Sequence, residues 1–297
     1  MKKISLNQAV QFDISRLFNG AIDVDWLVND PNIAASVARS FVFHGPAYHG
    51  VTQTDVIETG HKLIDSASFV KETVQGLVSG EANAFTLAIA GFGSGKSHMA
   101  VTLTELLETQ DVAHRATILK NLAQADASIA EHVERLLPEV EEKVLVITLN
   151  GMNNFDLASQ LLKQAKGKLQ KRHLSTDALE GVRKRFEYAA KVLSTLNCDL
   201  LPTLLDALNL SDVQEVLKKL VDYDEQTYKQ VHQFLSEIGI PLQAIGDETA
   251  KDVLTLLATN YVGEGKPFKK ILILFDEFGR YLEFATAHSH IAGNGAL

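Results

Sequence analysis

The sequence has one cysteine, no long apolar run and no excess of basic residues. The single cysteine, Cys198, excludes an internal disulfide framework and a cysteine-rich zinc site. No apolar run approaches the ~20 residues that a membrane span requires. Asp13 and Arg16 interrupt the stretch that follows the N-terminal lysines, so no signal peptide is predicted. We expect a cytoplasmic protein without a membrane partner.

The charge balance is acidic, with a formal net charge of −9 over 297 residues. This balance excludes a general nucleic-acid coat, because neutralising phosphates requires clustered Lys and Arg. Basic residues do gather in one stretch, for which two alternatives stay open: a DNA-contacting or partner-contacting patch, or a solvated helix surface. They are Lys163, Lys166, Lys168, Lys171, Arg172, Arg183, Lys184 and Arg185.

The apolar pattern predicts strands that alternate with helices. Three short apolar runs predict buried strands at 85–90, 144–149 and 271–275. Helical spacing predicts helices at 54–79, 96–108, 115–137 and through most of 155–260. Thr54 is the predicted N-cap of the first helix, Gly80 its end, and Pro138 limits the third. This order indicates an α/β fold in which helices flank a parallel sheet of at least three strands.

Glycines follow the first predicted strand in the pattern of a phosphate-binding loop. Ala90-Gly91-Phe92-Gly93-Ser94-Gly95-Lys96-Ser97 is a Walker A sequence in which alanine replaces the usual first glycine. The glycines let successive backbone N–H groups face phosphate oxygens, and the following helix adds its positive dipole. Lys96 should reach the β- and γ-phosphates of ATP, and the Ser97 hydroxyl should bind Mg²⁺. The residues predicted to bind the nucleotide are Gly91, Phe92, Gly93, Ser94, Gly95, Lys96, Ser97 and His98.

An acidic pair ends the third predicted strand, Ile271-Leu272-Ile273-Leu274-Phe275-Asp276-Glu277. Ligands of open α/β sheets lie at the carboxyl ends of the strands. Asp276 is therefore predicted to hold Mg²⁺ through a water, and Glu277 to polarise the attacking water as general base. Lys96 and Glu277 are the predicted catalytic residues. Without the glycine-rich loop, the same pair would indicate only a strand capped by solvated acids.

With both motifs in place, the chain resembles P-loop ATPases that carry a catalytic glutamate, a division that includes AAA+ and STAND proteins. Three segments are similar to large ATPases of bacterial phage-defence systems, namely those of DNA phosphorothioation-dependent restriction and of BREX. The three segments are 43–50 (Phe-His-Gly-Pro-Ala-Tyr-His-Gly), 91–98 and 274–280 (Leu-Phe-Asp-Glu-Phe-Gly-Arg). The resemblance implies a P-loop NTPase fold with a helical N-terminal region and a large helical insertion.

The same resemblance implies an ATPase that uses ATP and Mg²⁺ to drive or license a DNA-targeting complex. Its implied partners are a nuclease or nickase, with DNA reached through the full assembly. Self-association is a separate expectation, because strands missing from the sheet would leave its edges exposed. The alternative is a regulatory nucleotide-binding scaffold with slow or no turnover. A metabolic kinase is disfavoured, because Asp276-Glu277 suits activation of water better than delivery of phosphate to a substrate.

Four segments follow from these motifs. We expect a helical N-terminal region at 1–80, the first part of the ATPase core at 81–154, a helical insertion at 155–262, and the acidic strand with the start of a helix at 263–297. Only 20 residues follow Glu277, whereas a core of this division continues with two more strands. We therefore expect the chain to be the N-terminal part of a longer protein.

Several further polar residues have two interpretations. His44, Tyr48 and His49 could stack on the adenine base or pack within a turn. Asn150, Asn153 and Asn154 could orient water at the phosphate edge or cap a loop and helix. His98 could contact phosphate or pack behind the loop. Arg280 is expected to pair with a nearby acid, and His288 and His290 would not share a helix face as metal ligands.

Overall fold

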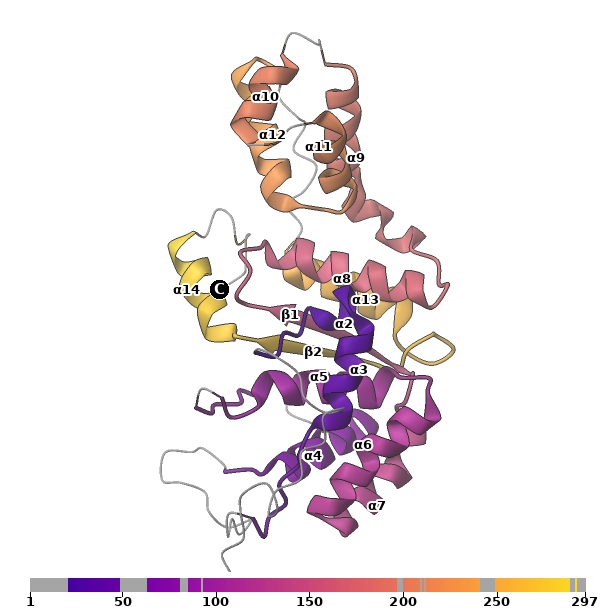
Figure 1. The fold of residues 1–297 in the computed structure, drawn as a ribbon. Helices are drawn as coiled ribbons and strands as arrows, with labels where there is room; N and C mark the ends of the chain where they lie inside the picture. Colours follow the sequence, from indigo (N-terminus) through magenta and orange to yellow (C-terminus); the bar gives the residue numbers. More distant parts are fainter. Residues whose placement is uncertain are drawn as a thin grey trace, which may run out of the picture. The chain divides into compact units, whose positions relative to one another are not determined.

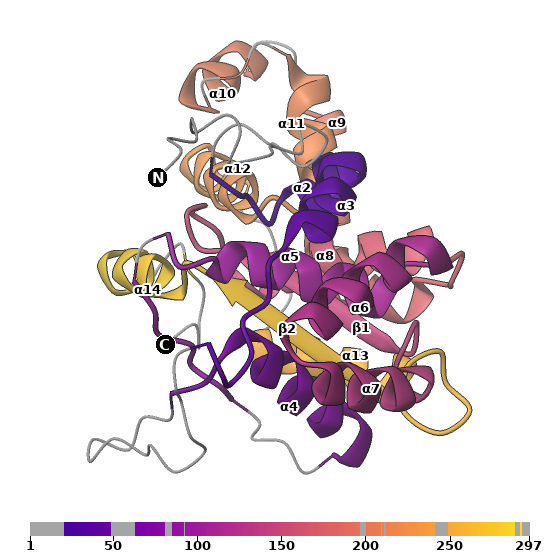
Figure 2. The same ribbon diagram turned by 60° about the horizontal axis from the view of Figure 1, so that its bottom comes forward.

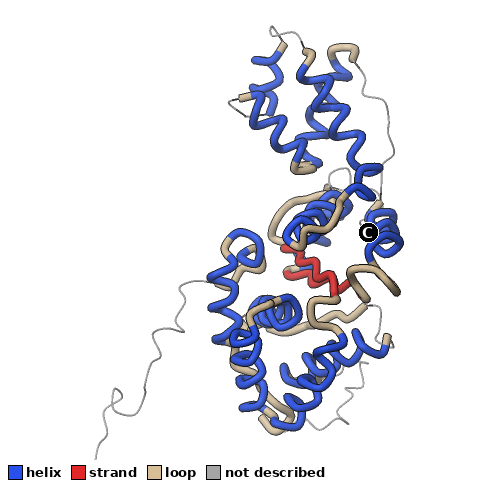
Figure 3. The backbone as a smooth tube through the Cα atoms, turned by 90° about the vertical axis from the view of Figure 1, so that its right-hand side faces the viewer, coloured by secondary structure: helices blue, strands red, loops and turns tan. Residues whose placement is uncertain are grey.

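The computed structural model describes residues 21–48, 63–80, 85–91, 93–196, 200–208, 210, 212–240, 249–288 and 292. The protein is a mixed α/β chain with 64% helix and a two-stranded parallel sheet. Figure 3 shows the two strands next to each other, with helices over most of the rest of the described chain. The chain divides into two compact units, residues 1–144 and 145–297, and each is described by itself. The four predicted segments stay a prediction.

The first unit is built from helices in the part of it that the structure describes. These are α2 (Trp26–Asn29), α3 (Pro31–Ser40), α4 (Ser66–Ser79), α5 (Lys96–Glu108), α6 (Val112–Ala125), α7 (Ala127–Leu136) and the 3₁₀ turn η2 (Leu137–Glu139). Helix α3 packs against α5 and α6, and α4 packs against α7 (Figure 2). Aspartates begin four of the helices, since each carboxylate accepts a hydrogen bond from a backbone N–H of the first turn. They are Asp30, Asp65, Asp111 and Asp126.

Two helix predictions in this unit need correction. The helix predicted from Thr54 is described from Ser66, where the Asp65 carboxylate accepts from the Ser68 N–H, while Thr54 lies outside the described residues. Gly80 ends this helix in a left-handed conformation, φ 73°, as predicted. The single helix predicted over 115–137 is two helices, because Asp126 leaves helical geometry at φ −159° and starts α7.

The strand predicted at 85–90 was wrong. Residues 85–90 adopt no regular secondary structure, and Phe85, Leu87 and Ile89 are each more than half exposed. A strand is held by hydrogen bonds to a neighbouring strand. Among residues 21–143, the described positions include no strand that could supply those bonds. The apolar composition of 85–90 therefore does not by itself produce a strand.

The second unit contains both strands. It consists of β1 (Val144–Asn150, whose first residue closes the first unit), α8 (Leu157–Lys171), η3 (Asp177–Leu179), α9 (Glu180–Ser194), α10 (Leu201–Leu208), α11 (Val213–Val221), α12 (Glu225–Glu237), α13 (Ala250–Tyr261), β2 (Lys270–Asp276) and α14 (Phe278–Ala287). Helices α8 and α13 pack together beside the strands, and α9, α11 and α12 pack on one another in a helical group (Figure 1). The predictions of strands at 144–149 and 271–275 are confirmed, and so is the prediction of helix through most of 155–260, for the residues of that range that the structure describes.

An apolar core joins the sheet to helices α8, α9 and α13 of the second unit. Leu145, Ile147 and Leu149 alternate along β1 and are fully buried in it, together with side chains of α8, α9 and α13. Alternate residues of a strand point to the same face, so this period defines the face that the helices cover. At the carboxyl ends of the strands the backbones touch, since the Gly151 N–H donates to the Asp276 carbonyl oxygen at 2.9 Å.

Candidate functional site

The glycine-rich loop has the backbone conformation that its glycines permit. Gly93 and Gly95 lie in the left-handed region, at φ 75° and φ 88°, which is costly for residues with a Cβ. The Ser94 N–H donates to the Gly91 carbonyl oxygen at 3.3 Å and closes a turn. Gly95 is the N-cap of α5, so Lys96 and Ser97 are the first two residues of that helix. The loop therefore leads directly into a helix N-terminus, where unpaired N–H groups and the dipole favour anions.

The Lys96 side chain folds back over the loop. Its Nζ donates to the carbonyl oxygens of Ala90, at 2.9 Å, and Gly91, at 3.1 Å. A primary ammonium keeps three donors, so these contacts hold the charge over the loop. Phe92 lies outside the described residues. The remaining predicted nucleotide contacts, from Gly91 to His98, are brought together by the structure within the first unit.

His98 contacts α3, one helical turn away from the loop. Its Nε2 lies 2.7 Å from the Val37 carbonyl oxygen, and its ring meets the Phe41 ring edge-on at 4.8 Å. Because a carbonyl can only accept, Nε2 carries the proton in this contact. Burial lowers the pKa of His98, the hydrogen bond to Val37 opposing this only in part, so the ring is neutral at pH 7. These contacts favour the packing alternative for His98.

The acidic pair lies at the carboxyl end of β2, in the second unit. Asp276 is the last residue of the strand, and Glu277 is the N-cap of α14. Glu277 has φ 52° and ψ 37°, a left-handed conformation that few non-glycine residues adopt. Strain of this kind persists where surrounding structure enforces it, and it clusters at functional sites. Both residues are half-buried.

Gly151 brings the ends of β1 and β2 into contact. A Cβ at this position would lie 2.2 Å from the Glu277 carbonyl oxygen, closer than any side chain can approach. The absence of a side chain therefore allows the Asn150-Gly151 turn to lie against Asp276 and Glu277. The sequence analysis assigned no role to Gly151. A glycine immediately after an apolar run was the pattern that could have indicated this close approach.

The predicted site residues fall into two groups. The loop residues belong to the first unit, and Asp276 and Glu277 belong to the second. Each group contains the chemistry predicted for it: a helix N-terminus and an ammonium in one, two carboxylates at a strand end in the other. Within the described residues, no three His, Cys, Asp or Glu side chains gather closely enough to hold a metal ion on their own.

The histidine and tyrosine ahead of the loop stack on each other. The rings of His44 and Tyr48 are 3.9 Å apart and 21° from parallel. Ser66, the first residue of α4, holds the His44 backbone through its hydroxyl, which accepts from the His44 N–H at 2.7 Å. These contacts are those of a packed turn, although Tyr48 is largely exposed. His49 lies outside the described residues.

Asn150 and Arg280 make local contacts. The Asn150 side-chain oxygen accepts from the Met152 N–H at 3.0 Å, which is loop-capping chemistry. Arg280 approaches Glu283 at 3.9 Å across a helical turn, as expected, but both side chains are mostly exposed and the pair adds little stability. His288 stacks on Phe284, and His290 lies outside the described residues.

Four residues of the basic stretch are engaged with the protein interior. Lys168 and Arg185 are buried. The Lys166 ammonium lies 4.6 Å from the centre of the Tyr223 ring, and the Arg172 guanidinium lies 4.9 Å from that of Phe268. In these cation–π contacts, both cations interact with aromatic rings of the same unit. The burial of Lys168 and Arg185 fits neither alternative given for the stretch, a DNA-contacting or partner-contacting patch or a solvated helix surface.

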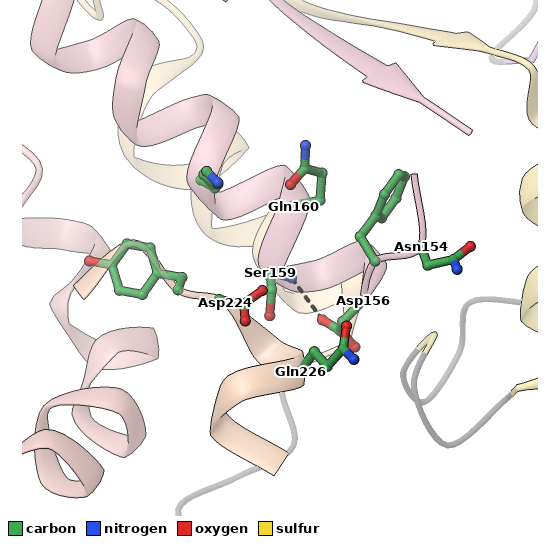
Figure 4. A pocket seen from close by; sticks show the side chains of 9 residues that line it. Asn154, Asp156, Ser159, Gln160, Asp224 and Gln226 are labelled. Carbon is green, nitrogen blue, oxygen red and sulfur yellow. Dashed lines mark hydrogen bonds between the residues drawn. The ribbon is translucent and has the colours of Figure 1, made fainter. Parts of the chain in front are cut away.

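A small polar cleft lies at the start of α8, where sequence reasoning had placed only Asn154 (Figure 4). Asp156, the N-cap of α8, accepts from the Ser159 N–H at 2.8 Å, and Asp224, the N-cap of α12, lines the opposite wall. Burial raises the pKa of the Asp156 carboxyl, and its hydrogen bonds and cationic neighbours offset this only in part. The cleft holds about 40 Å³ of water-accessible space.

Comparison of the chain with known protein families, with curated proteins and with solved structures gave no match. Among the described helices, none combines the length and apolar character needed to cross a bilayer.

Proposed function

We propose that this chain binds ATP with Mg²⁺ and hydrolyses it. The observation that carries the proposal is the loop at Gly91–Lys96, where two left-handed glycines lead into the N-terminus of α5 and an ammonium folds over the loop. Backbone N–H groups, the positive end of a helix dipole and a cationic side chain together favour the binding of a chain of phosphate groups.

The acidic pair supports hydrolysis rather than binding alone. Asp276 and the Ser97 hydroxyl supply oxygen atoms, the ligand type that Mg²⁺ prefers. Glu277 supplies a carboxylate for orienting and deprotonating water. The assignment of Ser97 and Asp276 to one ion rests on the two sequence motifs. Glu277 also has a left-handed backbone, which it shares with Glu142, His173 and Tyr223, and its place at the end of β2 supports a role for it.

Calorimetric titration of MgATP into the wild-type chain and into Lys96→Ala tests the binding. We expect saturable binding to the wild type and its loss in the variant, because the ammonium that faces the β- and γ-phosphates is gone. Equal binding to both chains, or none to the wild type, would contradict the proposal for this chain.

Turnover of MgATP by the wild type and by Glu277→Gln tests the hydrolysis. The amide keeps the shape of the side chain but cannot take a proton, so binding should persist while turnover falls about 10²–10⁴-fold. Hydrolysis that survives this change would remove the role from Glu277. A wild type that binds MgATP with no turnover would favour the regulatory scaffold instead.

We further propose that this activity serves a DNA-targeting defence assembly with a nuclease or nickase partner. What supports this is the likeness of residues 43–50, 91–98 and 274–280 to phage-defence ATPases. Because four of the basic residues are engaged internally, we do not assign DNA contact to the stretch from Lys163 to Arg185. Turnover measured with and without DNA, in the presence of co-purified partner proteins, tests the proposal, and DNA-independent turnover would count against it.

A further inference from the structure

We propose that His98 is a positioning residue that links the phosphate-binding loop to the C-terminal end of α3. The inference deepens the proposed function and rests on it for its effect on nucleotide affinity. His98 is the third residue of α5, within the turn that begins at Gly95. It can therefore influence the loop without touching a phosphate.

The first contact is with a carbonyl group in the last turn of α3. The Val37 carbonyl oxygen accepts from His98 Nε2 at 2.7 Å and from the Ser40 hydroxyl at 2.7 Å. Carbonyl groups at the end of a helix lack partners within the helix and need donors from elsewhere. His98 thus supplies a donor to α3, and in return α3 fixes the orientation of the first turn of α5.

The second contact runs through Phe41, the residue that follows α3. Its ring meets His98 edge-on at 4.8 Å and Phe43 edge-on at 4.7 Å. Its Cε2 atom lies 3.8 Å from the point where a Cβ on Gly95 would be. The ring therefore packs against the glycine whose left-handed conformation starts α5.

The backbone of this segment is itself held from α6. The side-chain amide of Asn121, a buried residue, donates to the carbonyl oxygens of Arg39 at 2.7 Å and Phe41 at 3.3 Å. Contacts therefore run continuously from α6 through residues 39–41 to His98 and Gly95. Thr102 adds a hydrogen bond from its hydroxyl to the His98 carbonyl oxygen at 2.8 Å.

The physical reason for such support lies in the glycines. A loop with several glycines loses more conformational entropy on ordering than other segments do. Any group that orders it before the ligand arrives lowers the entropy that binding must overcome, and so raises affinity. The neutral His98 ring can donate to Val37 without placing a charge beside the apolar Phe41 ring.

Two substitutions separate this role from general packing. His98→Leu removes the donor and keeps an apolar side chain, whereas His98→Gln keeps an N–H at a similar reach. The matched control is Val74→Ala, which removes fully buried side-chain atoms from α4, a helix of the same unit that packs mainly against α7. Hydrogen–deuterium exchange of residues 93–99 reports the order of the loop, and titration with MgADP reports affinity.

We expect His98→Leu to raise exchange at 93–99 and to weaken MgADP binding, each about tenfold, with both effects reduced in His98→Gln. Val74→Ala should leave the ratio of loop exchange to exchange in the rest of the unit unchanged. Equal effects of His98→Leu and Val74→Ala on that ratio would overturn the inference. So would loop exchange in His98→Leu that matches the wild type. If the wild type fails to bind MgADP while His98→Leu still loosens the loop, the proposed function fails and the positioning role stands.

Discussion

At the scale of single residues, replacing two glycines of the second unit by alanine should change the free energy of unfolding in opposite directions. In Gly151→Ala the added Cβ would lie 2.2 Å from the Glu277 carbonyl oxygen, so the strand ends must separate. We expect a loss of about 1–3 kcal/mol in the free energy of unfolding. Urea denaturation measures this difference.

Gly167→Ala is the control for that substitution. Gly167 lies inside α8, and nothing lies within 4 Å of a Cβ added there. Alanine should therefore raise the free energy of unfolding by about 0.5–1 kcal/mol, because the unfolded chain loses freedom and the helix gains a better former. If Gly151→Ala proved as benign as Gly167→Ala, the close approach of the two strand ends would be refuted.

Asp156 should make the second unit less stable as pH rises. Burial raises the pKa of its carboxyl in the folded state above the unfolded value of about 3.9. The stability linked to this group is therefore complete below pH ~3.9 and is lost as pH rises through the folded pKa. Asp156→Asn keeps the N-cap and removes the charge. It should match the wild type at low pH and exceed it at neutral pH, by about 1.4 kcal/mol for each unit of pKa shift.

Thermal unfolding of wild type and Asp156→Asn across pH 3.5–7.5 measures this difference. Asp156→Ala is the companion variant, because it also removes the hydrogen bond to the Ser159 N–H and should cost about 1 kcal/mol relative to the asparagine at every pH. If the wild type became more stable relative to Asp156→Asn as pH rises, the difference would have the opposite sign and contradict the prediction.

At the scale of elements, Asp126 decides that residues 112–136 form two helices. Its carboxylate accepts from the Ile129 N–H and from the Ser128 hydroxyl, each at 2.9 Å. The hydrogen bond from the Ile129 N–H, and to a smaller extent the one from Ser128, lowers the pKa of Asp126. The stability they contribute is therefore present above the unfolded pKa of about 3.9 and is lost as pH falls through the folded pKa.

Asp126→Ala should accordingly lower the free energy of unfolding by about 1 kcal/mol at pH 7. Asp126→Asn should lower it much less, because asparagine is also a good N-cap residue. The deficit of the alanine variant should shrink in acid, opposite in direction to the pH effect at Asp156. Circular dichroism melts at pH 7 and pH 3 provide the comparison. An undiminished deficit at pH 3 would exclude the carboxylate as its source.

At the scale of the whole molecule, ligand binding should appear as added stability. A ligand that binds only the folded state at 100 times its Kd contributes about 2.7 kcal/mol. For a unit of the size of residues 1–144, this raises the unfolding midpoint by roughly 5–10 °C. We expect MgATP to produce this rise in the wild type and not in Lys96→Ala. Equal rises in both would place the nucleotide elsewhere than at the loop of residues 91–98.

Local sequence was enough to locate the two motifs and most of the helices. The glycine spacing before Lys96 determines the loop, because only glycine enters the left-handed region at low cost. The apolar runs at 144–149 and 271–275 are strands, because each hydrogen-bonds to the other. Asp276 ends the second of them. Helix periodicity likewise placed α5, α8 and α13, because the bonds of a helix are made within the segment itself.

Tertiary structure decided everything that depends on a distant partner. The run at 85–90 is as apolar as β1, yet the described residues of its unit offer no strand to pair with, so it is not a strand. From the sequence, Lys166 and Arg172 could be read as surface charges. In the fold they lie beside the aromatic rings of Tyr223 and Phe268. The role inferred for His98 also depends on distant residues, because Val37 lies 61 positions away along the chain and only folding brings the two together.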